Sequence, residues 1–155
     1  MMAHYEPGHP GTCITLTSMQ YSHLHALYTE SPQRISRMYR LLVDLGIAAR
    51  CRRVPAEAVA ADHLALVHSS KYLATVESWK DLPDDEMRSV ALNYNSVYLN
   101  THSVACAKLS AGSTVRLVSQ VASGELDSAL AIVRPPGHHA GVSRSSSSYT
   151  SRAAL

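Results

Sequence analysis

Cysteine is scarce in this chain, and its cysteines are not arranged for pairing. Three occur in 155 residues, Cys13, Cys51 and Cys106, and no Cys-x-x-Cys pair is present. An odd number of widely spaced cysteines is not typical of a disulfide framework. We therefore interpret them as free thiols in a reducing compartment. Cys51 and Cys106 are expected to be small buried hydrophobes.

An excess of charge of one sign and a long apolar run are also lacking. The formal net charge is +2, which is too small to indicate a nucleic acid or an anionic membrane as partner. No apolar run approaches the roughly 18 residues of a membrane-spanning helix. The first ten residues do not combine a basic start with an apolar stretch, as a signal peptide does. These features predict a protein of the cytoplasm or nucleus.

The apolar patterning predicts a globular α/β domain, or part of one. Hydrophobic residues make up 46% of the chain, which is ordinary for a protein with a core. Ser31-Pro32 is a good helix start, and Gly46 is a good helix end. The acidic, proline-containing stretch 82–88 is expected to be a loop. Helices are expected over 31–46, 58–68, 69–79 and 101–123, and strands over 12–19, 51–54 and 128–133.

The longest predicted helix leads into a short, wholly apolar strand. Thr101 is its expected cap, and Gly124 follows its expected end. Small residues along it would allow close packing on a sheet. The order of a long helix followed by an apolar strand predicts a parallel sheet covered on both faces. The expected apolar stripe consists of Val104, Ala105, Leu109, Gly112, Val115, Val118 and either Val121 or Ala122.

The seven residues that directly follow this strand contain the candidate catalytic groups of the chain. The strand runs into Arg134-Pro135-Pro136-Gly137-His138-His139-Ala140. Proline fixes φ at two consecutive positions, and glycine lets the backbone approach a ligand closely. Histidine exchanges protons near neutral pH because its ordinary pKa is about 6.5. An enzyme of the α/β class presents acid and base groups in this way, at the carboxyl end of a strand.

The segment from Arg134 to Ala140 resembles the signature of the zinc-dependent histone deacetylase family. The resemblance extends upstream, and residues 1–4 are similar to the class IIb members. It implies a partial three-layer α/β/α fold with a parallel sheet, the arginase/deacetylase fold. The upstream segments that resemble the family are 30–35, 66–72, 95–98 and 111–113.

The resemblance also implies a reaction and roles for four residues. His138 and His139 would be the catalytic pair, with His139 as the general base toward a zinc-bound water. Gly137 would line the tunnel for the acyl-lysine, and Arg34 would line an internal channel behind the active site. The family hydrolyses acetyl-lysine to lysine and acetate, so an acetylated protein such as a histone or tubulin is the implied substrate.

The sequence departs from the family after Ala140. The family carries its zinc ligands beyond this point, whereas residues 141–155 contain six serines and few apolar residues. We expect 1–140 to be the N-terminal part of a deacetylase catalytic domain and 141–155 to be a disordered tail. We expect no metal site and no bound zinc in this chain. Two alternatives stay open: a truncated, inactive form, and a relative of the acetylpolyamine deacetylases.

Overall fold

The computed structural model describes residues 13–16, 33–94 and 97–135 of the chain. Three parallel strands form a sheet in the order β2-β1-β3: β1 is Cys13–Leu16, β2 is Arg52–Arg53 and β3 is Ala129–Ile132. A 3₁₀ turn, η2, covers Ala48–Arg50. The α-helices are α1 Gln33–Asp44, α2 Ala61–Ala65, α3 Ser70–Ser78, α4 Asp84–Ala91 and α5 Ser103–Ala122.

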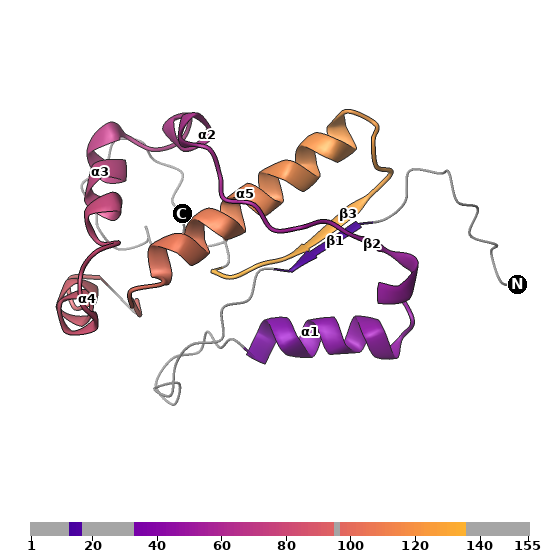
Figure 1. The fold of residues 1–155 in the computed structure, drawn as a ribbon, viewed down its shortest axis with the longest axis horizontal. Coiled ribbons are helices and arrows are strands. Elements are labelled where there is room, and N and C mark those ends of the chain that lie inside the picture. The colour runs from indigo at the N-terminus through magenta and orange to yellow at the C-terminus, as the bar shows by residue number, and fades with distance from the viewer. Residues whose placement is uncertain (1–12, 17–32, 95–96, 136–155) are drawn as a thin grey trace, which may run out of the picture.

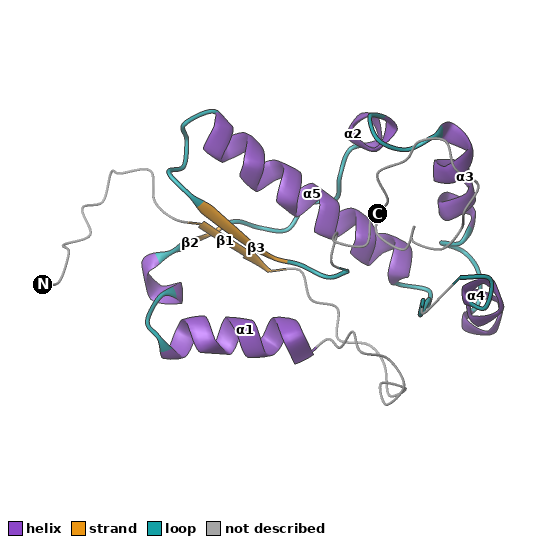
Figure 2. Cartoon of the chain, turned by 180° about the vertical axis from the view of Figure 1, so that it is seen from behind, coloured by secondary structure: helices purple, strands orange, loops and turns teal. Residues whose placement is uncertain are grey.

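The elements form three layers, as the resemblance implied. Helix α1 covers one face of the sheet and α5 covers the other (Figures 1 and 2). Helices α2, α3 and α4 gather around the N-terminal half of α5. The predicted α/β class and the parallel sheet are confirmed.

Strand β3 is apolar throughout because its alternate side chains face two different layers. On the α5 side, Ala129 and Ala131 pack against a buried cluster that includes Leu117 of α5. On the α1 side, Ile132 is buried together with Ile35 of α1. A parallel strand covered on both faces reads as a continuous apolar run, although Leu130 of β3 is 42% exposed. The small alanines let the long helix approach the sheet closely.

Helix α1 ends as predicted, whereas its predicted start at Ser31-Pro32 lies outside the described residues, and its apolar residues do not all reach the core. Gly46 adopts the left-handed conformation, with φ of 68°, as expected of a glycine after a helix. Of the predicted apolar side chains, Ile35 is buried and Leu42 packs beside it. By contrast, Met38, Leu41 and Leu45 are 43–62% exposed. Ile35 and Leu42 are seven residues apart and form the one line of the helix that meets β3.

The predicted loop over 82–88 is wrong, because this stretch begins helix α4. Pro83 precedes the helix, and the acidic residues Asp84, Asp85 and Glu86 form its first turn. Carboxylates stabilise a helix at its N-terminus, where the backbone N–H groups carry partial positive charge. Met87 then lies on the buried side with no exposed surface. The acidic run indicated a helix start rather than a solvated loop.

The predicted cap at Thr101 is also wrong. Asn100 organises the start of α5: its Oδ1 accepts from the His102 N–H at 2.9 Å and from the Ser103 hydroxyl at 3.3 Å. The Thr101 N–H donates instead to Asp84 Oδ1 of α4 at 3.0 Å. The N-cap position itself is occupied by His102, whose side chain makes no capping bond. A cap identified from residue type alone can therefore be misplaced by one position.

Helix α5 presents a different face to the core than its apolar stripe suggested. Three positions of the expected stripe are exposed: Ala105, Val118 and the last one, whether it is taken as Val121 or Ala122. Apolar and small residues occur all around this helix, so its sequence leaves the buried face ambiguous. The residues that lie buried are Val104, Ala107, Ser110, Gly112, Ser113 and Leu117.

Of the two helices predicted over 58–68 and 69–79, the first is shorter than expected and the second is confirmed. The helix expected over 58–68 is shortened to α2, because residues 54–60 run extended along α5. Their Val59 N–H donates to the Lys108 carbonyl at 2.9 Å. Helix α3 begins as expected, with the Ser69 hydroxyl accepting from the Tyr72 N–H at 3.3 Å.

Gly112 marks the tightest contact between α5 and the rest of the chain. A Cβ built at this position would lie 2.2 Å from the Glu57 carbonyl oxygen and 2.3 Å from the Val59 nitrogen. Both are backbone atoms, which cannot move aside as a side-chain tip can. The guanidinium of Arg116, one turn further along α5, bonds the Glu57 carboxylate at 2.6 Å. The extended segment is therefore held to α5 on both sides of Gly112.

We predict that Gly112→Ala destabilises the chain by about 1–3 kcal/mol, because the added methyl group must displace backbone. At an unobstructed helical position the same substitution would stabilise by about 1 kcal/mol. Urea unfolding followed by circular dichroism measures the difference. Ser119→Ala, at an exposed position of the same helix, is the matched control. Stability equal to or above that of the parent chain would contradict the contact.

Candidate functional site at the carboxyl edge of the sheet

The predicted motif leaves the sheet where two parallel strands end together. Leu16 at the end of β1 pairs in register with Ile132 at the end of β3. Ligands of open parallel sheets bind outside the carboxyl ends of the strands. Val133, Arg134 and Pro135 continue from β3 and are half-buried. The fold therefore delivers the start of the motif to the edge where such a site is expected.

A hydrogen bond from α5 holds the first proline of the motif. The Ser110 hydroxyl donates to the Pro135 carbonyl oxygen at 3.0 Å. Ser110 is only 4% exposed, so water does not compete freely for either group. The sequence analysis did not single out Ser110. A serine among the small residues of a helix that precedes a Pro-Pro turn is the signal that could have found it.

Arg134 of the motif lies near the Cys106 thiol of α5. Burial raises the pKa of the Cys106 thiol, and the positive charge of Arg134 opposes that rise only in part. Cys106 and Ser110 are four residues apart and share a face of α5. One face of the helix thus meets two consecutive residues of the motif. Cys106 and Cys51 are both half-buried, so they are less deeply placed than predicted.

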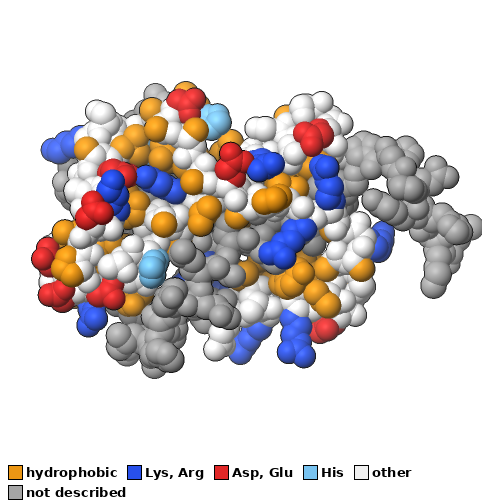
Figure 3. Space-filling model, viewed as in Figure 1, with side chains coloured by type: hydrophobic (Ala, Val, Ile, Leu, Met, Phe, Trp, Pro, Cys, Tyr) orange, Lys and Arg blue, Asp and Glu red, His pale blue; other side chains and the backbone are white. Residues whose placement is uncertain are grey.

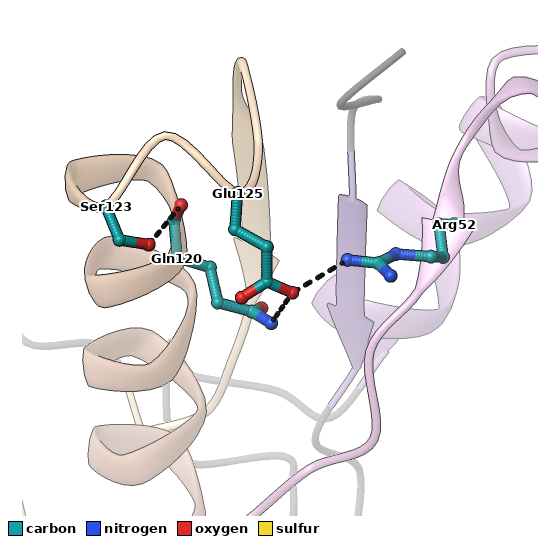
Figure 4. Close-up of polar contacts among 4 residues, drawn as sticks. All are labelled: Arg52, Gln120, Ser123 and Glu125. Carbon is teal, nitrogen blue, oxygen red and sulfur yellow. Dashed lines mark hydrogen bonds and ion pairs between the residues drawn. The ribbon is translucent and has the colours of Figure 1, made fainter. Parts of the chain in front are cut away.

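A polar network secures the other end of β3. Glu125, in the turn between α5 and β3, accepts from Gln120 of α5 at 2.8 Å and from Arg52 of β2 at 3.3 Å (Figure 4). The Ser123 hydroxyl donates to the Gln120 carbonyl at 3.2 Å. The strand that leads to the motif is therefore tied to its neighbours at its start as well as at its end.

Helix α3 is tied to α5 by an ion pair close to the site. The Lys108 ammonium bonds the Glu77 carboxylate, and Lys80 pairs with the same carboxylate at 3.3 Å. Hydrogen bonds from Lys108 and then Lys80 hold the pKa of Glu77 below its ordinary value. These groups are partly exposed, so the pairs contribute little stability each. They orient α3 rather than supply acid or base groups.

Most of the predicted site residues fall outside the part of the chain that the structure describes. Gly137, His138 and His139 are among these, and their predicted roles stay predictions. Arg34 is described: it lies in the first turn of α1 and is exposed. Its predicted place in an internal channel is likewise a prediction.

The described residues do not form a metal centre. Within 13–16, 33–94 and 97–135, no three His, Cys, Asp or Glu side chains gather in a group that could hold a metal ion. A catalytic zinc site needs about three protein ligands and an open position. The described side chains therefore do not fit the zinc that the resemblance implies.

The visible surface is mixed in charge. Acidic and basic side chains alternate on the face drawn in Figure 3, with apolar atoms between them. Among the described helices, none has both the length and the hydropathy that crossing a membrane requires.

We predict that Cys106 reacts slowly with iodoacetamide at pH 8, roughly threefold or more below its own rate in the urea-unfolded chain. The thiolate is the reactive form, and burial raises the thiol pKa, so less thiolate is present at that pH. Mass spectrometry of digested samples measures the rate at each cysteine. The rate should climb as the pH is raised toward 10. A folded-state rate above the unfolded one would contradict the assigned environment.

Comparison with known proteins gives a consistent assignment. The family model described as "Histone deacetylase domain" matches residues 28–148. The polyamine deacetylase HDAC10 of Danio rerio is 37% identical over 110 residues, which are 71% of this chain and 16% of that protein. Histone deacetylase 5 of Arabidopsis thaliana is 41% identical over 114 residues, 73% of this chain and 17% of that protein.

A solved structure shares the fold. The crystal structure of the HDA15 HD domain superposes with a TM-score of 0.71 at 24% identity, over 92% of this chain and 40% of that one. The chain spans about a sixth of the length of the two relatives above. A family model that matches residues 28–148, well over half of the sequence, together with the three-layer fold, shows that this chain belongs to the histone deacetylase family.

Proposed function

We propose that this chain contributes the histidine-bearing strand and its supporting helices to an enzyme that removes acetyl groups from amines by hydrolysis. The observation that carries the proposal is the match to the deacetylase domain over residues 28–148, which includes the motif. The fold supports it, since β3 leads the motif to the carboxyl edge of a parallel sheet.

The proposed chemistry is proton transfer at an amide. As a neutral imidazole, His139 accepts a proton from the water that attacks the acetamide carbonyl carbon, and His138 beside it assists. The C–N bond then breaks, the proton passes to the leaving amine, and acetate is released. Gly137 would line the passage of the acyl group, and Arg34 would line a channel behind it. All four assignments rest on the motif matches.

Two substrate classes fit the relatives. Their names describe histone deacetylases in Arabidopsis thaliana and a polyamine deacetylase in Danio rerio. We propose an acetylated protein, such as a histone or tubulin, as the substrate in the cytoplasm or nucleus. An acetylated polyamine is the second candidate, and the HDAC10 match favours it. We also propose that residues 1–140 are the deacetylase segment and that 141–155 take no part in it.

Zinc is the metal of this family, but the described side chains do not fit it. The alternative that this chain has no activity by itself also rests on the lack of a zinc site among the described side chains. This alternative and the proposed function agree if the chain works only as one part of a larger catalytic domain.

We predict that the purified 155-residue chain binds less than about 0.1 equivalent of zinc after dialysis at pH 7.5, because about three clustered ligands are needed for tight binding. Plasma emission spectrometry measures the metal. Acetyl-lysine peptide hydrolysis should stay at the rate of the buffer blank. One tightly held zinc per chain, with turnover that is lost on His139→Ala, would contradict this.

A chimera tests the proposed function itself. Residues 28–140 of this chain replace the matching segment of Arabidopsis histone deacetylase 5, and hydrolysis of an acetyl-lysine peptide and of an acetylated polyamine is measured. We predict an active chimera in which His139→Ala lowers kcat by at least about 100-fold, the usual contribution of a general base.

The control is His63→Ala, at an exposed position of α2, which should leave kcat unchanged. A folded chimera whose activity does not depend on His139 would overturn the proposed role of the motif. Preference for the polyamine in the chimera, but not in the host enzyme, would favour the second substrate class.

A further inference from the structure

The two edges of the sheet are built differently. Strand β2 forms one edge with two exposed arginines, Arg52 and Arg53. Charged side chains on an edge strand protect it against pairing with another chain. Strand β3 forms the other edge and contains only alanine, leucine and isoleucine. Among the residues that the structure describes, β1 alone pairs with β3, so the outer edge of β3 is a template for a further strand.

The centre of β3 is open to solvent on the α1 side. Leu130 alternates with Ala129 and Ala131, which pack toward α5, so its side chain points to the α1 layer. Ile132, on the same face, is buried with Ile35 of α1. Leu130 is nevertheless 42% exposed. Helix α1 therefore covers the end of β3 and leaves a large apolar side chain uncovered at the edge of the sheet.

Helix α5 carries exposed apolar side chains on the same side of the molecule. Leu117 packs toward the sheet, and Arg116, one residue earlier, bonds Glu57 in the segment that follows β2. Successive helical residues are about 100° apart, so Val118 projects to the side opposite Arg116, away from β2 and past the outer edge of β3. Val118 and Val121, about one turn apart on this side, are 62% and 36% exposed.

Helix α1 has a matching stripe on the other face of the sheet (Figures 1 and 2). Met38, Leu41 and Leu45 are 43–62% exposed and recur at helical spacing. A β1–α1–β2 crossover is right-handed in almost all proteins. With Ile35 turned to the sheet, this hand turns Met38, three residues later, toward the outer side of β3. Apolar side chains of both covering helices therefore flank the strand edge.

We infer that the β3 edge is an interface between two copies of this chain, in which β3 pairs with β3 of the copy, antiparallel, about a two-fold axis. The edge presents backbone N–H and C=O groups, so its partner must be a strand. The strands predicted from the sequence, at 12–19, 51–54 and 128–133, correspond to the three already in the sheet. A second copy supplies the strand, and the two-fold axis sets each apolar stripe against its own counterpart.

The charges at this face fit a two-fold contact. The charged side chains of α5, Lys108 and Arg116, bond Glu77 and Glu57 on other sides of the helix and leave the side of Val118 and Val121 apolar.

On α1, Arg37 and Asp44 are exposed and lie near opposite ends of the apolar stripe. A two-fold axis reverses the direction of the second helix, so Arg37 of one copy approaches Asp44 of the other. The contact therefore brings opposite charges together at its rim, where they favour the correct partner and register.

Sedimentation velocity of the full 155-residue chain over a range of concentrations tests the inference. We expect a reversible dimer with twice the 16.8 kDa mass of one chain. Leu130→Lys sets like charges opposite each other and removes apolar contact, so it should raise the dissociation constant at least about tenfold. The matched control is Leu92→Lys, at an 87% exposed leucine that ends α4, which should leave the dissociation constant unchanged.

A mixing experiment tests the symmetry. Position 130 meets its own copy across a two-fold axis. An equimolar mixture of Leu130→Lys and Leu130→Glu chains should therefore recover the dimer that neither variant forms alone, because opposite charges then face each other across the strand pair. A mixture that stays monomeric, although each variant is folded, would contradict the pairing of β3 with β3.

A parent chain that stays monomeric overturns the inference, as do assemblies that grow without closing at two copies. A dimer that Leu130→Lys leaves intact, or that Leu92→Lys weakens equally, also overturns it. If circular dichroism shows that Leu130→Lys does not fold, Val118→Lys at its exposed helical position is judged by the same criteria.

A monomer that binds the remaining segment of the Arabidopsis histone deacetylase 5 domain would assign the edge to that segment and exclude the second copy. None of these measurements involves hydrolysis. Failure of this inference is therefore distinct from failure of the proposed function, which the chimera tests.

Discussion

The close approach of α5 to the backbone of residues 57–59 is the contact on which the described structure depends. It is possible only because Gly112 has no side chain. The Glu57–Arg116 ion pair and the Val59–Lys108 hydrogen bond hold the same crossing. With α5 placed there, its inner face meets the alanines of β3, and the three layers follow. A bulkier residue at 112 would separate the helix from the segment that leads toward α2.

The strand that carries the motif is held at both ends by the same helix. At its start, Gln120 of α5 and Arg52 of β2 share the Glu125 carboxylate (Figure 4). Beyond its end, Ser110 holds the Pro135 carbonyl. A parallel strand of four residues has little backbone pairing of its own. Side-chain contacts from the covering helix therefore add to the few backbone hydrogen bonds that hold the strand in place.

Where sequence patterns were local, they predicted the structure well. The Ser69 cap and the Gly46 end are interactions within one turn of chain, and both are confirmed. The acidic run at 84–86 was misinterpreted because charge indicates exposure as well as a helix start. The predicted buried side of α5 was wrong because the helix itself has small and apolar residues on all of its sides. The buried side of α5 depends on the elements that pack against the helix, and the periodicity of its own sequence does not predict that side.

The sequence by itself determined the family, the parallel α/β class and the identity of the histidine motif, because each is a property of residue order over short stretches. Only the tertiary structure decided how that motif is supported. Ser110 meets Pro135 across 25 residues, and Gly112 meets Glu57 across more than 50. Neither pairing leaves a local pattern, since a serine and a glycine in a helix have many possible roles. Their roles follow from which backbone passes beside them once the layers have packed.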